Sequence, residues 1–391
     1  MKLLANMLSV IFAAGMFLAF LKFTQNASAG LLAPDALSAS EMELNPTGDA
    51  YEISLDTSGN LWVSDYSAGE LWKVSPASNT YSVYPVSGTP SDAHADSSGK
   101  IWWANTFNSQ ISRLSPVTNT VETWDVPGSA QLYGLQVESP QKIWVNDADL
   151  PYIYQLDLSS SQLCTYTIPL DWTSGYILYR NGQVWSGDSE NGRMYRLSPA
   201  PLNQITFWQL PTGSKPEGMA FDSSGNIWWS NYNIGILDRL NPTTGTGLLS
   251  RFLLPRGTSP EMIAWDGSYM WYGENSQTAV GRLDPLVASK TDIPLTSQTD
   301  PITPQCVPIQ ASEPVGVTPT PGTISFVNKS YPVLQNSGGW AIYELPDLAV
   351  PWGIVYREDY LWLVDTGRQM LIKFSNAPID EIPVYLPLVV K

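Results

Sequence analysis

The sequence contains very little cysteine and histidine. Its 391 residues include two cysteines, Cys164 and Cys306, and one histidine, His94. Two cysteines are too few for a disulfide scaffold, and their spacing matches no metal-binding cysteine motif. One disulfide stays possible in an oxidising compartment. The two cysteines lie far apart in the repeats described below, however, and disulfide geometry is strict, so we expect free thiols.

Charged residues are also scarce, and basic residues most of all. Only 14% of the residues are charged, and 36 acidic against 20 basic residues give a formal net charge of −16. Such an acidic chain repels phosphate backbones and anionic lipids, which argues against nucleic-acid binding. Divalent cations or cationic ligands are easier partners, although an acidic surface also simply keeps an exported protein soluble.

Helical patterns are missing beyond the N-terminal segment. No long apolar pattern at helical spacing follows it, whereas 31 Pro and 29 Gly indicate many short strands joined by turns. The sequence also holds 16 Trp and 19 Tyr, and wide aromatic side chains suit the gaps between packed sheets.

The N-terminus has the order of a signal peptide. Lys2 precedes an apolar run over 3–21, and small residues at 27–29 form a cleavage site. We predict a signal peptide over 1–29 and a tether over 30–40. The apolar run is long, so an uncleaved membrane anchor is the alternative. Either one places the rest of the chain outside the cytoplasm, secreted, periplasmic or on the cell surface.

One phrase recurs along the chain. "DSSGNIWWSN" at 222–231 resembles "DSSGKIWWAN" at 96–105 and "DTSGNLWVSD" at 56–65. Its tryptophan repeats at intervals of 40, 42, 41, 43, 43 and 91 residues, and a period in the low forties is the size of one four-stranded propeller blade. The anchor tryptophans are Trp62, Trp102, Trp144, Trp185, Trp228, Trp271 and Trp362.

Each repeat predicts four antiparallel strands. An apolar strand leads through an Asp- and Gly-containing turn into the tryptophan strand, and a third strand ends in phrases such as "YRLSP" at 195–199. A single blade cannot bury both of its faces, and a closed ring removes exposed sheet ends. We therefore predict an all-β fold over 41–387, a seven-bladed β-propeller of four-stranded antiparallel blades.

Two segments fall outside the regular repeat. The N-terminal strand within 41–51 is predicted to complete the last blade, whose first three strands come from 353–375, although the tail at 381–387 competes for that place. The stretch at 296–339 is rich in Pro, Thr and Ser, and we predict an insertion on the rim. A degenerate eighth blade is the alternative there, and 388–391 is a short tail.

Polar residues end every tryptophan strand, and another set begins every first strand. Because these two strands are antiparallel, both sets are expected at one mouth of the ring, where loops on a rigid scaffold commonly form sites. The first set can equally serve to start turns, as Asp and Asn often do. The first set is Asp65, Asn105, Asp147, Asp188, Asn231, Glu274 and Asp365, and the second is Tyr51, Ser91, Tyr133, Gly175, Glu217, Glu261 and Trp352.

Neighbouring blades bring carboxylates to this mouth. Glu217, Glu261 and Glu274, with Asn231, are candidate ligands for Mg²⁺ or Ca²⁺, which prefer oxygen ligands. The three carboxylates are also catalytic candidates, because they could raise one another's pKa and create a general base. His94 lies within a first strand, where a hydrogen-bonded structural role is favoured over a general base.

The mouth also carries aromatic residues. Tyr51, Tyr133 and Trp352, together with Asn231, are candidate ligand-binding residues at its rim. The ligand would be a small molecule or a peptide, and we expect a monomer that meets a membrane only if the N-terminal segment stays uncleaved.

The repeated phrase "DSSGNIWWSN…RLNP" resembles the streptogramin lyase family, the virginiamycin B lyase-like seven-bladed propellers, over 51–295 and more loosely over 340–375. NHL-type propellers have a similar pattern. The resemblance implies a magnesium-assisted elimination that opens a cyclic depsipeptide at its ester bond, with a histidine base and acidic metal ligands.

Single positions can be compared with the family pattern. "WYGE" supplies Glu274 where the family has a glutamate, whereas "PEGM" places Glu217 at the position of the family histidine and "SPEM" places Glu261 in the next blade. The family base is therefore missing. Two hypotheses follow: a propeller that binds a ligand or partner without turnover, and a metal-dependent lyase or lactonase that uses carboxylates.

Overall fold

The computed structural model describes residues 36–375 except 46, 170–174, 233, 243–245 and 256–258. These residues form β-strands and turns, with two short 3-10 helices at Thr106–Asn108 (η1) and Asn275–Gln277 (η2). No helix within the described ranges is long and apolar enough to cross a membrane. The predicted signal peptide and the tail at 381–387 lie outside the described residues.

Four-stranded antiparallel units repeat along the chain. The first consists of β2 (Ala50–Leu55), β3 (Leu61–Asp65), β4 (Glu70–Ser75) and β5 (Thr80–Pro85), paired in that order. The following units are β6 (Pro90–Ala95), β7 (Ile101–Asn105), β8 (Gln110–Ser115) and β9 (Thr120–Asp125); β10 (Leu132–Ser139), β11 (Lys142–Asp147), β12 (Tyr152–Asp157) and β13 (Gln162–Thr167); β14 (Ile177–Arg180), β15 (Gln183–Asp188), β16 (Arg193–Ser198) and β17 (Gln204–Gln209); β18 (Pro216–Phe221), β19 (Ile227–Asn231), β20 (Ile236–Asn241) and β21 (Thr246–Leu253).

Two further units take a strand from a distant part of the sequence. One pairs β22 (Pro260–Trp265), β23 (Met270–Glu274) and β24 (Ala279–Leu283) with β30 (Trp340–Glu344). The other pairs β31 (Pro351–Arg357), β32 (Tyr360–Asp365) and β33 (Met370–Ser375) with β1 (Ala36–Glu43). The N-terminal strand therefore completes the last unit, as the sequence predicted, and it begins at Ala36, within the stretch predicted as a tether.

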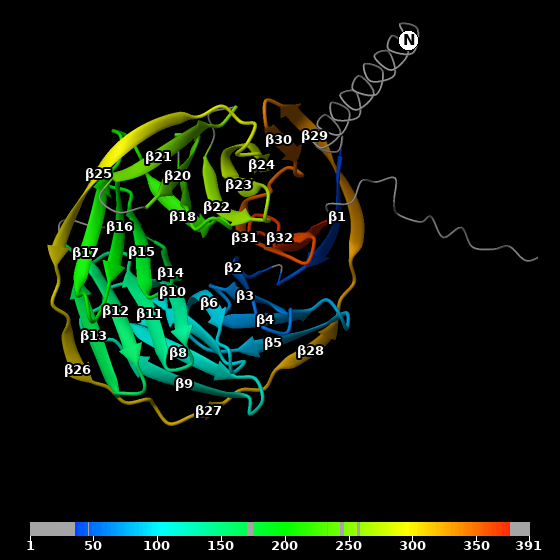
Figure 1. Cartoon of the computed structure of the whole chain (residues 1–391). Coiled ribbons are helices and arrows are strands. Elements are labelled where there is room, and N and C mark those ends of the chain that lie inside the picture. Colours follow the sequence, from blue (N-terminus) through cyan, green and yellow to red (C-terminus); the bar gives the residue numbers. More distant parts are fainter. Residues whose placement is uncertain are drawn as a thin grey trace, which may run out of the picture.

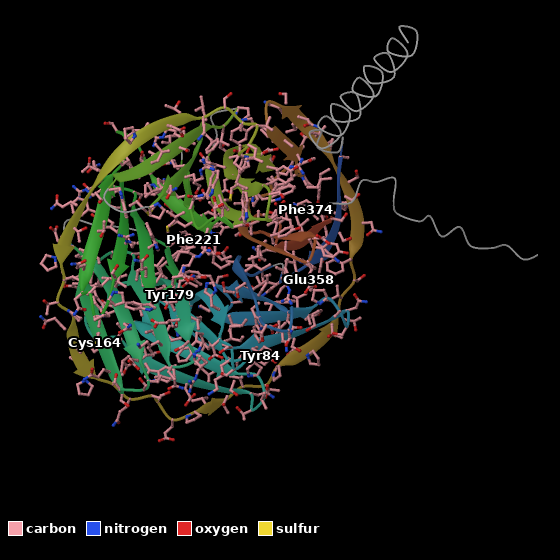
Figure 2. All side chains as sticks on the ribbon, in the orientation of Figure 1. Tyr84, Cys164, Tyr179, Phe221, Glu358 and Phe374 are labelled. Carbon is pink, nitrogen blue, oxygen red and sulfur yellow. A yellow bond between two sulfur atoms is a disulfide. The ribbon has the colours of Figure 1, made fainter. Side chains whose placement is uncertain are left out.

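The first strands of the units form a closed cycle around a central axis. Contacts run from β2 to β6, β10, β14, β18, β22 and β31, and β31 contacts β2 again. Figure 1 shows the units arranged as a ring around this axis, and Figure 2 shows side chains filling the spaces between them. The all-β propeller architecture is confirmed.

The anchor tryptophan contacts two other recurring residues, the Asp that begins the repeated phrase and the basic residue of the third strand. In the second unit, Asp96 accepts the backbone N–H groups of Ser98 and Lys100 at 2.7 and 3.1 Å and the Trp102 indole N–H at 2.9 Å. The Arg113 guanidinium lies 4.8 Å from the centroid of the same ring, at cation–π distance. One carboxylate thus closes the turn and orients the buried ring. The indoles of Trp62, Trp144, Trp228 and Trp271 donate to Asp56, Glu138, Asp222 and Asp266 in the same way.

The segment between β24 and β30 runs around the outer rim and adds an outermost strand to every unit; we call residues 288–337 the belt. Figure 1 shows it as the yellow-to-brown ribbon along the perimeter. It forms no separate blade of its own. β25 (Thr291–Pro301) pairs with β21 and β17, β26 (Gln305–Pro308) with β13, β27 (Val315–Gly316) with β9, β28 (Thr320–Thr323) with β5, and β29 (Val327–Ser337) with β1 and β30.

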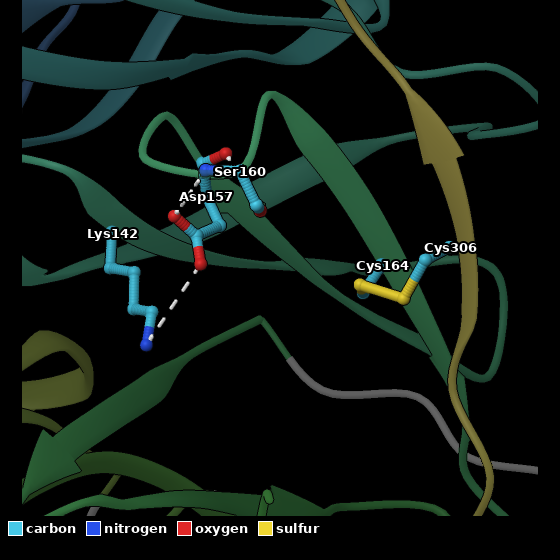
Figure 3. The surroundings of a disulfide bond; sticks show 5 residues. All are labelled: Lys142, Asp157, Ser160, Cys164 and Cys306. Atoms are coloured by element: carbon cyan, nitrogen blue, oxygen red, sulfur yellow. Dashed lines mark hydrogen bonds and ion pairs between the residues drawn. A yellow bond between two sulfur atoms is a disulfide. The ribbon is translucent and has the colours of Figure 1, made fainter.

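The expectation of free thiols was wrong, because Cys164 and Cys306 form a disulfide. The belt passes back around the ring and brings β26 alongside β13, where the two cysteines stand directly opposite each other with their Cα atoms 4.0 Å apart. Figure 3 shows this bond between the belt and the unit beneath it. The distance between the two cysteines in the repeats did not predict this contact, because the belt passes the units in the order opposite to their order in the chain.

Candidate ligand site at the axial mouth

A β-bulge recurs where the first strand reaches the mouth, in every unit except the one formed by β14–β17. Ala50 pairs with Asp65 and Ile53 with Val63, so that Tyr51 and Glu52 together face one residue, Ser64. Bulges bend a strand and redirect its side chains, and they are frequent beside functional sites. Equivalent register shifts enclose residues 91–92, 133–134, 217–218, 261–262 and 352–353.

Polar residues of the second strand stabilise these bulges. Ser64 Oγ accepts the backbone N–H of Glu52 at 3.3 Å, and Ser230 Oγ accepts that of Gly218 at 3.0 Å. Asn146 Oδ1 accepts the backbone N–H of Gly134 at 2.8 Å. The second bulge residue loses its normal ladder partner, so these bonds satisfy an amide that would otherwise be unpaired. The bulge is thus stabilised by the residue one place before the end of the tryptophan strand.

Aromatic side chains from separate units meet at the bulges. The Tyr133 hydroxyl donates to the Tyr51 hydroxyl at 2.7 Å, although one unit lies between them in the ring. The Tyr51 and Trp352 rings lie 4.6 Å apart between centroids. Three residues proposed from the sequence as ligand-binding are therefore brought together, and they form the aromatic half of the mouth.

A hydrogen bond spans the axis beneath these rings. The Tyr176 hydroxyl, just before β14, donates to Glu52 Oε1 of β2 at 2.9 Å, and these strands lie on opposite sides of the ring. The Trp352 indole N–H lies 3.0 Å from the Tyr176 hydroxyl and 3.2 Å from Glu52 Oε1. Glu52 and Tyr176 were missed in the sequence because only the residue before each of them, Tyr51 or Gly175, was selected.

The acidic half of the mouth adjoins the aromatic half at Gly175. A Cβ atom there would lie 3.3 Å from the Tyr133 ring and 3.5 Å from Glu217 Oε1, so the missing side chain allows both groups to approach. Burial raises the pKa of Glu217 to about 7. Burial and the charge of Glu217 raise the pKa of Glu261 to about 8, against a hydrogen bond with Asn275. Two proposed residues, Glu217 and Glu261, are therefore close enough to interact electrostatically.

Ionisation of the buried Glu52 makes the stability of the folded protein depend on pH. Burial, followed by the charge of Asp92, raises its pKa from 4.5 to about 8, although hydrogen bonds from Tyr176 and Trp352 oppose the shift. Between these pH values the folded protein retains a proton that the unfolded chain releases. The contribution of Glu52 to stability is thus fully present below about pH 4.5 and is lost as the pH rises through about 8.

We therefore expect the substitution Glu52→Gln to reduce the loss of stability at alkaline pH, because glutamine accepts the same hydrogen bonds without ionising. The thermal midpoints of wild type and variant should diverge in favour of the variant between about pH 5 and about pH 9. The exposed substitution Glu313→Gln is the control. Parallel pH profiles for wild type and Glu52→Gln would contradict the prediction.

Five of the polar residues that end the tryptophan strands bind the loop that enters the first strand of their unit. Asp65 Oδ1 accepts the backbone N–H groups of Asp49 at 2.8 Å and Ala68 at 3.0 Å. Asn105 Oδ1 accepts that of Thr89 at 2.9 Å. These bonds match the turn-forming role that was the alternative to a role in a ligand or metal site. Asp147, Asn231 and Asp365 likewise accept the backbone N–H groups of Ala130, Lys215 and Val350.

Two further proposed site residues, Asn231 and Glu274, are buried at the ends of their tryptophan strands. The Asn231 amide accepts the Lys215 N–H at 2.9 Å and donates to Asp238 at 2.9 Å, so both of its ends are engaged within the chain. Glu274 is 1% exposed, and its charge, after burial, raises the pKa of Tyr272.

The described residues contain no group of three or more His, Cys, Asp or Glu side chains arranged to hold a metal ion. Glu217, Glu261 and Glu274 accordingly do not fit a shared metal site. Mg²⁺ or Ca²⁺ stays a prediction from the sequence.

His94 lies in the wall beside the mouth. Its Nε2 is 2.7 Å from Asp92 Oδ1 and 3.2 Å from Gln136 Nε2. Burial lowers its pKa, but the charge of Asp92 and its hydrogen bond outweigh this and raise the pKa overall. Asp92 Oδ2 also accepts the Leu135 N–H at 2.9 Å, so the pair belongs to a hydrogen-bonded wall. This agrees with the structural role favoured from the sequence.

The model of the virginiamycin B lyase family matches residues 37–285. The chain belongs to this family. The resemblance stated from the repeated phrase is therefore confirmed. No curated protein sequence matches the chain.

Solved structures agree with the family assignment at the level of the fold. Virginiamycin B lyase from Staphylococcus aureus is 17% identical, with a TM-score of 0.65 over 86% of this chain and 98% of that one. A streptogramin B lyase is 16% identical, with a TM-score of 0.67 over 87% and 98%. A catalytically inactive histidine-to-alanine variant of the staphylococcal lyase with quinupristin is 16% identical, with a TM-score of 0.64 over 86% and 98%.

Proposed function

We propose that this virginiamycin B lyase family member is an exported seven-bladed propeller that binds a small-molecule or peptide ligand at its axial mouth. The observation that carries the proposal is the set of bulges, which gathers Tyr51, Tyr133, Trp352, Glu217 and Glu261 from separate units around one axis. The signal-like N-terminus and the Cys164–Cys306 disulfide support export, because structural disulfides persist in oxidising compartments.

The two halves of the mouth suggest the chemistry of the ligand. The Tyr51 and Trp352 rings offer an apolar surface for a planar or aliphatic group. Glu217 and Glu261 accept hydrogen bonds from amides or hydroxyls when ionised and donate one when protonated. A cyclic peptide with aromatic and amide groups satisfies both halves, and quinupristin, the molecule present with the related lyase, is the first probe.

We expect the substitution Trp352→Ala to weaken quinupristin binding about tenfold or more, because it removes the ring packed against Tyr51 and the indole that donates to Tyr176. Isothermal titration calorimetry measures the affinity. Trp265→Ala is the matched control, since that indole bonds to Ser223 at the end of β22 that lies away from the mouth. Equal affinities of both variants and wild type for quinupristin would remove the mouth as its binding site.

An enzymatic function is the second candidate, and the carboxylate pKa values of about 7 and 8 favour it. A carboxylate that titrates near neutral pH is suited to general-base catalysis. Glu217 would take a proton from the carbon next to a carbonyl, a carbon–carbon double bond would form, and the ester C–O bond would break to release a carboxylate. Mass spectrometry decides the reaction, because elimination leaves the mass of the opened ring unchanged whereas lactone hydrolysis adds one water.

A further inference from the structure

The belt carries one apolar residue for each gap between neighbouring units. These residues recur every seven or eight positions, and each packs into a different hydrophobic cluster between two units. The belt therefore docks on the ring by a repeated contact rather than as an irregular loop. The anchors are Ala288, Leu295, Ile302, Ile309, Val317, Ile324 and Tyr331.

The backbone of the belt repeats a contact as well. Ile302 N–H donates to the Asn203 carbonyl at 2.9 Å, and Ile324 N–H donates to the Asn79 carbonyl at 2.9 Å. Both acceptors have positive φ in the turn between the third and fourth strands of their unit. The N–H groups of Ile309 and Val317 donate to the equivalent carbonyls of Ser161 and Asn119.

The strength of the docking is uneven along the belt. Ile302 and Ile324 are 7% and 8% exposed, whereas Ile309 and Val317 between them are only partly buried. All side chains of β26 and β27 are exposed, and β27 pairs over two residues. Burial of apolar side chains is the main stabilising contribution at such a surface. Residues 303–323, which we call the middle section, are therefore the most weakly held part of the belt.

The disulfide lies within the middle section. Cys306 is exposed in β26, and Cys164 is buried in the same cluster as the anchor Ile302. The bond thus joins a solvent-accessible, weakly docked strand to the well-packed unit beneath it (Figure 3). Accessible sulfur atoms can be attacked by thiolates, whereas buried ones are protected.

We propose that the belt is a redox-sensitive strap: reduction of the Cys164–Cys306 disulfide releases the middle section from the rim, while the ring and the buried belt ends stay folded. A dithiol reductant supplies the two electrons and two hydrogens. Its thiolate attacks the sulfur of Cys306, the protein S–S bond breaks, and closure of the dithiol to a cyclic disulfide leaves both cysteines as thiols.

Release exposes the outer edges of three units. β26, β27 and β28 cover β13, β9 and β5, and their departure leaves the N–H and C=O groups of those strands unpaired. An unpaired edge is a template for an added strand. Reduction therefore converts a closed rim into one with open edges on three adjacent units.

Hydrogen–deuterium exchange of the full-length protein, with and without dithiothreitol, tests the proposal. We expect exchange in the middle section to rise about tenfold or more on reduction, with little change around Leu295 and Tyr331. Unchanged exchange in the middle section overturns the proposal, and so does a rise throughout the ring.

Two single substitutions separate the disulfide from other effects of the reductant. Cys306→Ser should show the raised exchange without dithiothreitol and no response to it. Val307→Ser, at the neighbouring exposed position of β26, should respond to dithiothreitol as wild type does. A dithiothreitol response retained in Cys306→Ser assigns the effect elsewhere and overturns the proposal.

Discussion

The substitution Arg368→Ala is expected to lower the free energy of unfolding by about 3–5 kcal/mol, because it leaves two buried carboxylates without their cation. Arg368 donates to Glu41 Oε1 at 2.8 Å and to Asp365 Oδ2 at 2.5 Å, and the carboxylates are 4% and 0% exposed. Glu41 belongs to the closing strand β1 and also accepts the Tyr331 hydroxyl of the belt. The substitution thus weakens the closing strand, the last unit and the belt together. Urea unfolding followed by tryptophan fluorescence measures the loss.

The surface ion pair of Lys290 and Asp292 provides the control for Arg368. Their charged groups lie 3.0 Å apart with side chains 33% and 41% exposed, so Lys290→Ala should cost less than about 1 kcal/mol. Lowering the pH protonates carboxylates and should recover part of the stability of Arg368→Ala but not of Lys290→Ala. Equal losses in the two variants would show that the buried cation is not required.

Replacing both cysteines with serine is the second large change, with an expected loss of about 2–5 kcal/mol. Cys164 and Cys306 are 142 residues apart, and a bond across so long a segment restricts the unfolded chain strongly. Unfolding in urea should shift to lower concentration for the double variant. The wild type in dithiothreitol should match it, and the double variant should not respond to dithiothreitol. A double variant as stable as the oxidised wild type would contradict the entropic argument.

The sequence specified the units well because each is encoded locally. Asp96, Trp102 and Arg113 lie within a single repeat, and their contacts close one turn and orient one ring. Closure by the N-terminal strand was also predictable, since the last unit lacked a fourth strand. The belt was not predictable as a set of strands. Its apolar residues recur every seven or eight positions, a spacing that has meaning only once the distance between neighbouring units is known.

The site was predicted in part for a similar reason. Alignment on the turns placed Tyr51, Tyr133 and Glu217 at the start of first strands, and the structure brings them to the axis. Glu52 was missed because ordinary strand alternation directs only one of two successive residues to each face, whereas a bulge does not follow it. Tyr176 was missed because Gly175 was selected at the corresponding position of its unit. Glu274 was selected for its residue type at a strand end, and the structure places it, 1% exposed, opposite Pro260.

The position of β1 has a mechanical consequence. The strand is paired along its length with β33 on one side and with β29 on the other, antiparallel to both. Tension applied at Ala36 along the strand therefore loads two rows of hydrogen bonds in shear, so that they must fail together rather than one after another. Pulling β1 along its own axis is therefore resisted by both neighbouring strands at once.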